Sequence, residues 1–138
     1  MSPYDFSWMV GLIIIRVSFN EPSLWLFSMG ANSGISAECP WRILKNGSIV
    51  VSHEDHAQKY GLSAPVDAIT YASSVLASQE IKEVKVRDGT ADLLISLAGN
   101  IRLEVIPFSS GYESWQVACP SGWQVIAQGG GQLSAWQR

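Results

Sequence analysis

The chain has 138 residues, the usual size of a single domain, so residues 1–138 are expected to form one globular domain with one hydrophobic core. Apolar residues make up 47% of the chain and charged residues only 15%, which excludes disorder as its general state. The net charge of -3 and the absence of a Lys/Arg cluster argue against a nucleic-acid partner, because neutralising phosphates needs a basic face.

The first half of the chain has the pattern of an antiparallel meander, with runs of Val, Ile, Leu and aromatic residues between turn signals. Pro40 interrupts one of these runs and indicates a bulge or a sheet edge. Asn46-Gly47 predicts a hairpin, because both central positions of a type I′ turn need positive φ. The predicted strands cover residues 8–19, 24–27, 35–39, 41–44 and 48–52.

One helix is predicted, over residues 64–78. Ser63 is placed to act as its N-cap, Pro65 lies in the first turn, and Asp67 lies where the helix dipole favours a negative charge. One face of this helix carries Val66, Ile69, Ser73 and Leu76, with Ala72 beside them.

The second half alternates apolar and polar residues more regularly, with Arg102 and Glu104 on the outer face and turns at Asp88-Gly89 and Gly99-Asn100. The predicted strands cover residues 84–86, 93–97, 101–105, 115–117 and 123–125, with an edge strand over 133–136. We therefore expect an α+β fold: a mainly antiparallel, curved sheet of eight to ten strands with the helix packed on one face.

The sequences of the two halves can be aligned with small insertions. The matched residues are Val17 with Val84, Phe19 with Val86, Leu24 with Leu93, Leu26 with Ile95, Gly30 with Gly99, Ile35 with Ile101, Ala37 with Leu103 and Glu38 with Glu104. A duplicated meander joined by the helix would explain these matches. Alternation alone would also produce them.

The densest group of titratable residues is His53-Glu54-Asp55-His56, in which two histidines three residues apart could share a metal ion. The H-E-x-x-H spacing and a third ligand are missing, so we favour a solvated loop and expect no metal or cofactor. If that loop lines a cleft, both imidazoles are candidates for proton transfer. Gly129-Gly130-Gly131 lacks a following Lys-Ser/Thr, so it predicts a hinge or tight turn and not a phosphate loop.

Cys39 and Cys119 lack the C-x-x-C spacing of redox and zinc sites, and we expect buried free thiols rather than a disulfide or a nucleophile. The apolar run Leu12 to Ile15 is far shorter than the roughly 20 residues that span a bilayer, and no basic segment precedes it. We therefore expect a cytoplasmic protein without a membrane partner. Few charges and six Trp residues leave apolar surface on a lone subunit, which predicts a homodimer.

Two short segments combine Trp, Tyr and Arg, the residue types that dominate protein interfaces. The predicted partner-binding residues are Trp41, Arg42, Asp55, Tyr112, Glu113 and Trp115. Most of Trp41 and Trp115 is expected in the core, which leaves Arg42, Tyr112 and Glu113 to meet the partner.

Several short motifs resemble a loosely defined family of small bacterial proteins of unknown function. They are Pro40-Trp41-Arg42 followed by Asn46-Gly47, the segment from Asp55 to Tyr60-Gly61, and Tyr112-Glu113-x-Trp115 followed by Gly122, Gly129-Gly130-Gly131 and Trp136. Some similar proteins lie near toxin genes or on mobile elements and are regarded as immunity-like. The resemblance implies a β-rich bacterial binding protein, with no catalytic residues to carry over.

The sequence thus favours a non-catalytic cytoplasmic protein that binds another protein through an aromatic and acidic patch, with inhibition of that protein as one outcome. The alternative is a small-molecule-binding protein or enzyme. Its pocket would lie between sheet and helix, lined by Trp and Tyr, with His53 or His56 at the mouth. A structural subunit of a larger assembly is a third class, which predicts an interface much larger than the usual roughly 1,600 Å².

Overall fold

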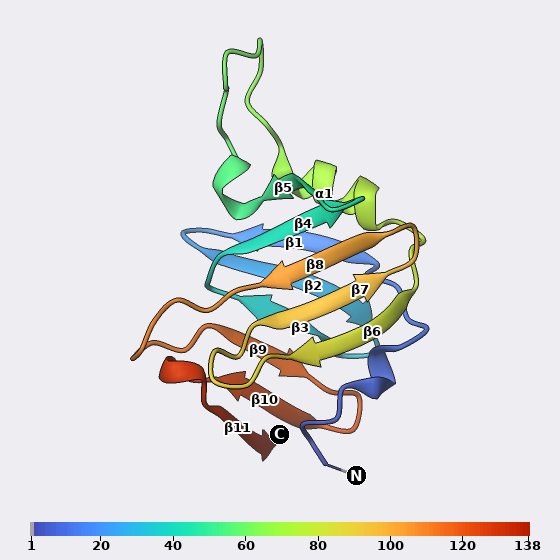
Figure 1. The fold of residues 1–138 in the computed structure, drawn as a ribbon, viewed down its shortest axis with the longest axis vertical. Coiled ribbons are helices and arrows are strands. Elements are labelled where there is room, and N and C mark those ends of the chain that lie inside the picture. Colours follow the sequence, from blue (N-terminus) through green and yellow to red (C-terminus); the bar gives the residue numbers. More distant parts are fainter. Residues whose placement is uncertain (1) are drawn as a thin grey trace.

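Two antiparallel β-sheets make up most of the protein, as the computed structural model of residues 2–138 shows (Figure 1). The six-stranded sheet contains, in spatial order, β1 (Arg16–Asn20), β2 (Leu24–Gly30), β3 (Ser33–Ala37), β9 (Trp115–Ala118), β10 (Trp123–Ala127) and β11 (Leu133–Gln137). The five-stranded sheet contains β5 (Ser48–Ser52), β4 (Trp41–Lys45), β8 (Ile101–Val105), β7 (Leu93–Leu97) and β6 (Ile81–Val86). Within residues 2–138, the prediction of a mainly antiparallel β fold with a single α-helix is confirmed.

The hydrophobic core lies between the two sheets. Alternate residues of each strand point into it, so that Leu93, Ile95 and Leu103 are fully buried as the alternation predicts. Trp41 of the five-stranded sheet packs edge-on against Trp25 and Phe27 of the six-stranded sheet, with ring centroids 4.9 and 5.3 Å apart. These aromatic contacts join the sheets and bury large apolar area.

The chain forms two sheets and not the single curved sheet that the alternation suggests. The run predicted as one interrupted strand, residues 35–44, is divided at Pro40: β3 ends in one sheet and β4 begins in the other. Proline has no backbone N–H to donate to a ladder, so it suits this crossing point. The first predicted strand is also shorter than expected. A short 3-10 turn, Ser7–Met9, is followed by Gly11 with a φ of 90°, and the pairing of β1 with β2 begins only at Arg16.

The single helix, α1 (Ala68–Leu76), begins four residues later than predicted. Its N-cap is Asp67, whose Oδ1 accepts hydrogen bonds from the backbone N–H groups of Ile69 and Thr70, both at 3.1 Å. Ser63 does not cap the helix, because it lies four residues before the N-cap. It belongs to residues 57–65, which are exposed and form a projecting arm (Figure 1). The arm turns tightly at Tyr60 and Gly61, which have φ values of 49° and 78°.

The helix does not cover a sheet face as predicted; it packs against β1 and β5, an edge strand of each sheet (Figure 1). Its buried residues are Ala68, Ala72 and Leu76, and the two alanines let its backbone approach the strands closely. Within residues 2–138, no helix has the length and apolar character needed to cross a membrane.

The two halves of the chain follow the same connection pattern. β1, β2 and β3 form a meander in the six-stranded sheet, and the chain then crosses to the β4–β5 hairpin in the five-stranded sheet. β6, β7 and β8 form a meander in the five-stranded sheet, and the chain crosses back to the β9–β10 hairpin. The halves meet through the β3–β9 and β4–β8 pairs. β11 has no counterpart in the first half.

Candidate functional site

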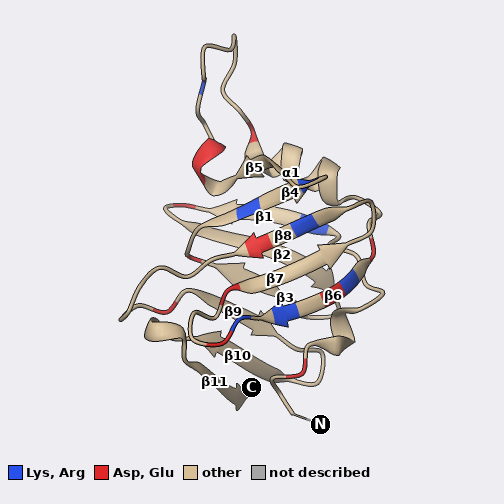
Figure 2. Ribbon diagram, in the orientation of Figure 1, with Lys and Arg blue, Asp and Glu red and all other residues tan. Residues whose placement is uncertain are grey.

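Six loops lie at one end of the two packed sheets, because the strand registers place the C-terminal ends of β1, β3, β5, β6, β8 and β10 at that end. We call this the loop end. Seven of the twelve acidic residues lie in these loops, and Figure 2 shows them in red, while most blue segments lie on the strands of the five-stranded sheet. The seven are Glu21, Glu38, Glu54, Asp55, Asp88, Asp92 and Glu113.

A cleft of about 600 Å³ opens at the loop end between the β3–β4 crossing and the β8–β9 loop. Its lining includes Glu38 and Glu113, and among the described residues neither carboxylate forms an ion pair. Phe108 and Tyr112 flank the cleft and are 81% and 83% exposed. The Ser109 hydroxyl accepts the backbone N–H of Tyr112 at 2.9 Å, which fixes the turn that presents the ring.

A second cleft, of about 440 Å³, adjoins the first. The two share the segment Glu38-Cys39-Pro40 as a common wall. The second cleft is lined further by Phe19, Glu21, Pro22, Ser23, Trp25, His53, His56 and Ala57. The loop that carries the two histidines therefore lines a cleft, together with two aromatic rings and two acidic side chains.

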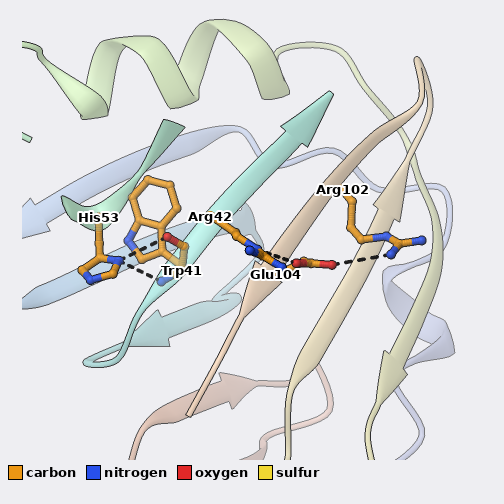
Figure 3. A network of polar contacts seen from close by, with 5 residues as sticks. All are labelled: Trp41, Arg42, His53, Arg102 and Glu104. Atoms are coloured by element: carbon orange, nitrogen blue, oxygen red, sulfur yellow. Dashed lines mark hydrogen bonds and ion pairs between the residues drawn. The ribbon is translucent and has the colours of Figure 1, made fainter. Parts of the chain in front are cut away.

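Both histidines are held by the backbone. His56 Nδ1 accepts the N–H of Ala68 at 3.2 Å, so in the neutral ring the hydrogen is on Nε2. His53 Nδ1 lies 3.2 Å from the backbone N and 3.3 Å from the carbonyl O of Trp41, so it has a partner in either tautomer (Figure 3). Within residues 2–138, no three His, Cys, Asp or Glu side chains are grouped to hold a metal ion.

The two thiols do not have the character of nucleophiles. Burial raises the pKa of Cys39 to about 12, and burial also raises the pKa of Cys119. Because the thiolate is the reactive form, both side chains stay protonated and inert near neutral pH. Both cysteines are free thiols; Cys119 is buried, as expected, and Cys39 is half-buried.

Comparison of the chain with protein-family models, with curated proteins and with solved structures finds no match. Its function is therefore inferred from the geometry of the site.

The structure separates the six predicted partner-binding residues into four groups. Trp41 and Trp115 are 1% and 0% exposed, so they belong to the core and have no surface to offer a partner. Tyr112 and Glu113 lie together at the first cleft. Asp55 lies in the neighbouring histidine loop, where it accepts the Tyr60 hydroxyl at 2.7 Å; this hydrogen bond raises the pKa of Tyr60.

Arg42 lies on the outer face of the five-stranded sheet, away from the clefts. Its Nε donates to Glu104 Oε1 at 2.7 Å, and Arg102 reaches the other carboxylate oxygen at 3.5 Å (Figure 3). Glu104 is only 6% exposed, so the two guanidinium groups neutralise a carboxylate that is largely out of water. Arg42 therefore neutralises Glu104 and lines neither of the two clefts.

Phe108 and Glu38 were missed as site residues. Phe108 follows the last strand of the second meander and stands alone among Pro, Ser and Gly residues, a setting typical of an exposed loop aromatic. Glu38 continues the alternation of β3 and so resembles a solvated strand residue. Only the crossing between sheets at Pro40 places it in a cleft wall.

Proposed function

We propose that the protein is a non-catalytic, protein-binding protein that binds its partner with the loop end. The observation that carries this proposal is the exposure of Phe108 and Tyr112, 81% and 83%, in the loop that lines an open cleft. Exposed aromatic rings held by an ordered turn supply contact area at little entropic cost, and Tyr is enriched among the residues that dominate binding energy.

The negative charge of the loop end indicates that the partner carries a basic surface. Glu38 and Glu113 line the first cleft, and Glu21 extends the negative charge into the second. The Lys and Arg residues in the six loops of the loop end are Arg87 and, on the arm, Lys59. A partner segment that carries Lys or Arg would neutralise these acids, and Arg could also stack on the exposed rings.

The resemblance to immunity-like bacterial proteins supports a more specific form of this proposal. In that form, the partner is a toxin encoded nearby or on the same mobile element, the complex forms in the cytoplasm, and binding inhibits the toxin. A single exposed end rich in acids and aromatic rings suits such a role, because it can cover a basic functional surface without any chemistry of its own.

Small-molecule binding is the second candidate, supported by the presence of His53 and His56 in the cleft beside Trp25. This cleft lies among loops and not between sheet and helix. The space next to α1, lined partly by Ser73 and Ala77, measures about 210 Å³, below the roughly 300 Å³ at which ligand pockets begin. The Nδ1 atoms of both histidines already have backbone partners. Protein binding is therefore the better supported function.

We also infer that the two halves arose by duplication of a meander followed by a hairpin. The shared connection pattern supports this, and so does the pairing register. Trp41 begins β4 opposite Val105 of β8, and Trp115 begins β9 opposite Ala37 of β3. The register refines the match between the halves: Val17 pairs with Phe27 as Val84 pairs with Ile95, so Phe27, and not Leu26, corresponds to Ile95.

Affinity capture tests the protein-binding proposal. The wild-type protein and a Phe108→Ala/Tyr112→Ala variant are used as baits in extracts of the source cell, and captured proteins are identified by mass spectrometry. We expect a specific partner that the double variant loses, with a Kd at least roughly 10-fold weaker when measured by calorimetry. A matched control is Tyr71→Ala, which removes a 46%-exposed ring from α1 and should leave binding unchanged.

A second variant tests the charge of the partner. Replacing Glu38 and Glu113 with Gln should weaken binding and flatten its dependence on salt, because two cationic contacts lose their counter-charges. Capture of no specific protein by the wild type, or equal binding by the Phe108→Ala/Tyr112→Ala variant, would contradict the proposal.

A further inference from the structure

Four strands lie at the edges of the two sheets: β1, β11, β5 and β6. Unpaired edges invite pairing with another chain, and proteins ordinarily cover them or place charges along them. α1 packs against β1 and β5. Ile81 of β6 exchanges hydrogen bonds with Gly11 and Leu12, each at 2.8 Å, and Lys82, Glu83 and Lys85 occupy the rest of that strand.

β11 lacks both kinds of protection along the part of the chain that the structure describes. No other strand of residues 2–138 pairs with its outer side. Residues 114–137, which include β9, β10 and β11, contain no Asp, Glu, Lys or Arg. Trp136 of β11 is 47% exposed on the outer face of the sheet. This combination of a free, uncharged edge and an exposed Trp distinguishes β11 from the other three edges.

The hydrogen bonds to β10 determine which backbone groups of β11 are free. Gly122 O accepts the N–H of Arg138 at 3.0 Å, and Gln132 O accepts the N–H of Gln128 at 2.8 Å. Residues 132 and 138 therefore face β10. Because alternate residues of a strand direct their N–H and C=O groups to the same side, Leu133, Ala135 and Gln137 direct theirs away from the sheet.

We infer that β11 pairs antiparallel with β11 of a second copy of this chain, so that two six-stranded sheets join across a two-fold axis. An axis at Ala135 pairs this residue with its own copy and pairs Leu133 with Gln137 of the second copy, which uses all of the free backbone groups. The same register sets Trp136 opposite Ser134, a small side chain over which the indole can pack.

The occupant is a second copy because the edge is complementary to itself. Arg138 is the cation next to β11. In this register it lies opposite Gln132 of the second copy, six residues along the strand from Arg138 of that copy, so the two like charges do not meet. The proposal also agrees with the homodimer expected from composition. It does not depend on the proposed protein-binding function, because Phe108 and Tyr112 lie outside β11.

A five-residue edge is short, so we expect a dimer that dissociates on dilution, with a Kd on the order of micromolar rather than nanomolar. Sedimentation velocity of the full chain over a range of roughly 1 to 500 μM should show the mass rise from 15.0 kDa toward twice that value. Hydrogen exchange over the same range should slow at the amides of Leu133, Ala135 and Gln137.

Two variants and a matched control test the surface. Ala135→Pro removes an N–H that faces away from β10, and Trp136→Lys places a charge on the edge; both should keep the chain monomeric at concentrations where the wild type is dimeric. Ile49→Lys changes a 57%-exposed residue on β5, an edge against which α1 packs, and should leave the dimer intact. Trp136→Lys keeps the test valid if Ala135→Pro fails to fold. A monomeric wild type, or a dimer that survives Trp136→Lys, would overturn the inference.

Discussion

Glu104 is a carboxylate on the outer face of a sheet, a position where side chains are ordinarily solvated, and yet it is 6% exposed. The sequence predicts its outward direction correctly but not its burial. Arg42, 62 positions earlier in the chain, lies directly opposite Glu104 in the β4–β8 pair and makes the shorter of the two ion-pair contacts to this carboxylate. A buried carboxylate depends on such partners, because an uncompensated charge is costly out of water.

Replacing Arg42 should therefore cost more stability than replacing Arg102. We expect Arg42→Ala to lower the free energy of unfolding by about 1.5 to 3 kcal/mol, the range for hydrogen bonds to charged groups. Arg102→Ala should cost less, because its contact to Glu104 is 3.5 Å long. Urea denaturation of both variants measures the difference. Equal losses would show that Glu104 does not depend on the 2.7 Å contact.

Asp67 caps α1, and its contribution should depend on pH. Hydrogen bonds from the backbone and side chain of Thr70 hold the pKa of Asp67 below its ordinary value of 3.8. A lowered pKa in the folded state means that the charged cap stabilises the protein above pH 4 and loses this effect as the pH falls through the folded-state pKa. Asp67→Ala should cost about 1 kcal/mol at pH 7 and progressively less below pH 4.

The matched control for the cap is Ser63→Ala, at the residue that the sequence favours. Ser63 lies on the exposed arm, so its replacement should change the free energy of unfolding by less than about 0.5 kcal/mol. Thermal or urea unfolding at pH 7 and pH 3.5 would give both comparisons. A larger loss for Ser63→Ala than for Asp67→Ala would place the start of the helix where the sequence predicts it.

Among the larger elements, the loop between β10 and β11 shows why the triple glycine is present. Of the two predicted alternatives, a hinge or a tight turn, the structure has the tight turn: Gly129–Gly131 forms a 3-10 turn in which Gly130 has a φ of 78°. The turn presses against two other loops. A Cβ at Gly129 would lie 2.5 Å from backbone atoms of Gly111, and one at Gly131 would overlap the carbonyl of Gly89.

Alanine substitutions at Gly129 and at Gly111, the two sides of this contact, should differ in their effect on stability. Gly129→Ala should destabilise the protein by about 1 to 3 kcal/mol, because the backbone of the β8–β9 loop must move. Gly111→Ala meets no atom within 4 Å and should be nearly neutral. Unfolding midpoints by circular dichroism would measure both. If both variants are neutral, the two loops do not approach as closely as the structure shows.

At the level of the whole chain, neither half completes its own sheets. β3 needs β9, and β4 needs β8, as neighbours. The arm offers a place to divide the chain, because residues 57–65 are exposed and Gly61 has open space around it. Division between Gly61 and Leu62 separates the first meander and hairpin from the second without removing a strand.

Fragments 1–61 and 62–138 should each lack cooperative unfolding when alone, and should recover the native circular dichroism spectrum when mixed. The reason is that the β3–β9 and β4–β8 pairs are made only between the halves. Dispersed amide resonances in the mixture, and their absence from each fragment, would provide the measurement. A fragment that unfolds cooperatively by itself would show that one half is a complete folding unit.

Local patterns were enough to predict the strands of the second half, their faces and their turns. Alternation in Leu93, Ile95 and Leu103 reflects a side-chain period that is a property of the strand itself, and dipeptides such as Gly99-Asn100, with φ values of 75° and 57°, specify turns through their own φ preferences. Burial of Trp41 and Trp115 also followed from their large apolar rings. These features depend on near neighbours in the chain, and the structure agrees with them.

The division into two sheets, the position of α1 and the loop-end clefts were decided by tertiary structure. The first cleft joins Glu38 to Tyr112, 74 positions along the chain, and only the pairing of β3 with β9 brings them together. Pairing partners distant in sequence are chosen by the packing of the whole core, which no local period encodes. The site therefore depends on the tertiary structure, whereas most of the strands that carry it can be predicted from the sequence alone.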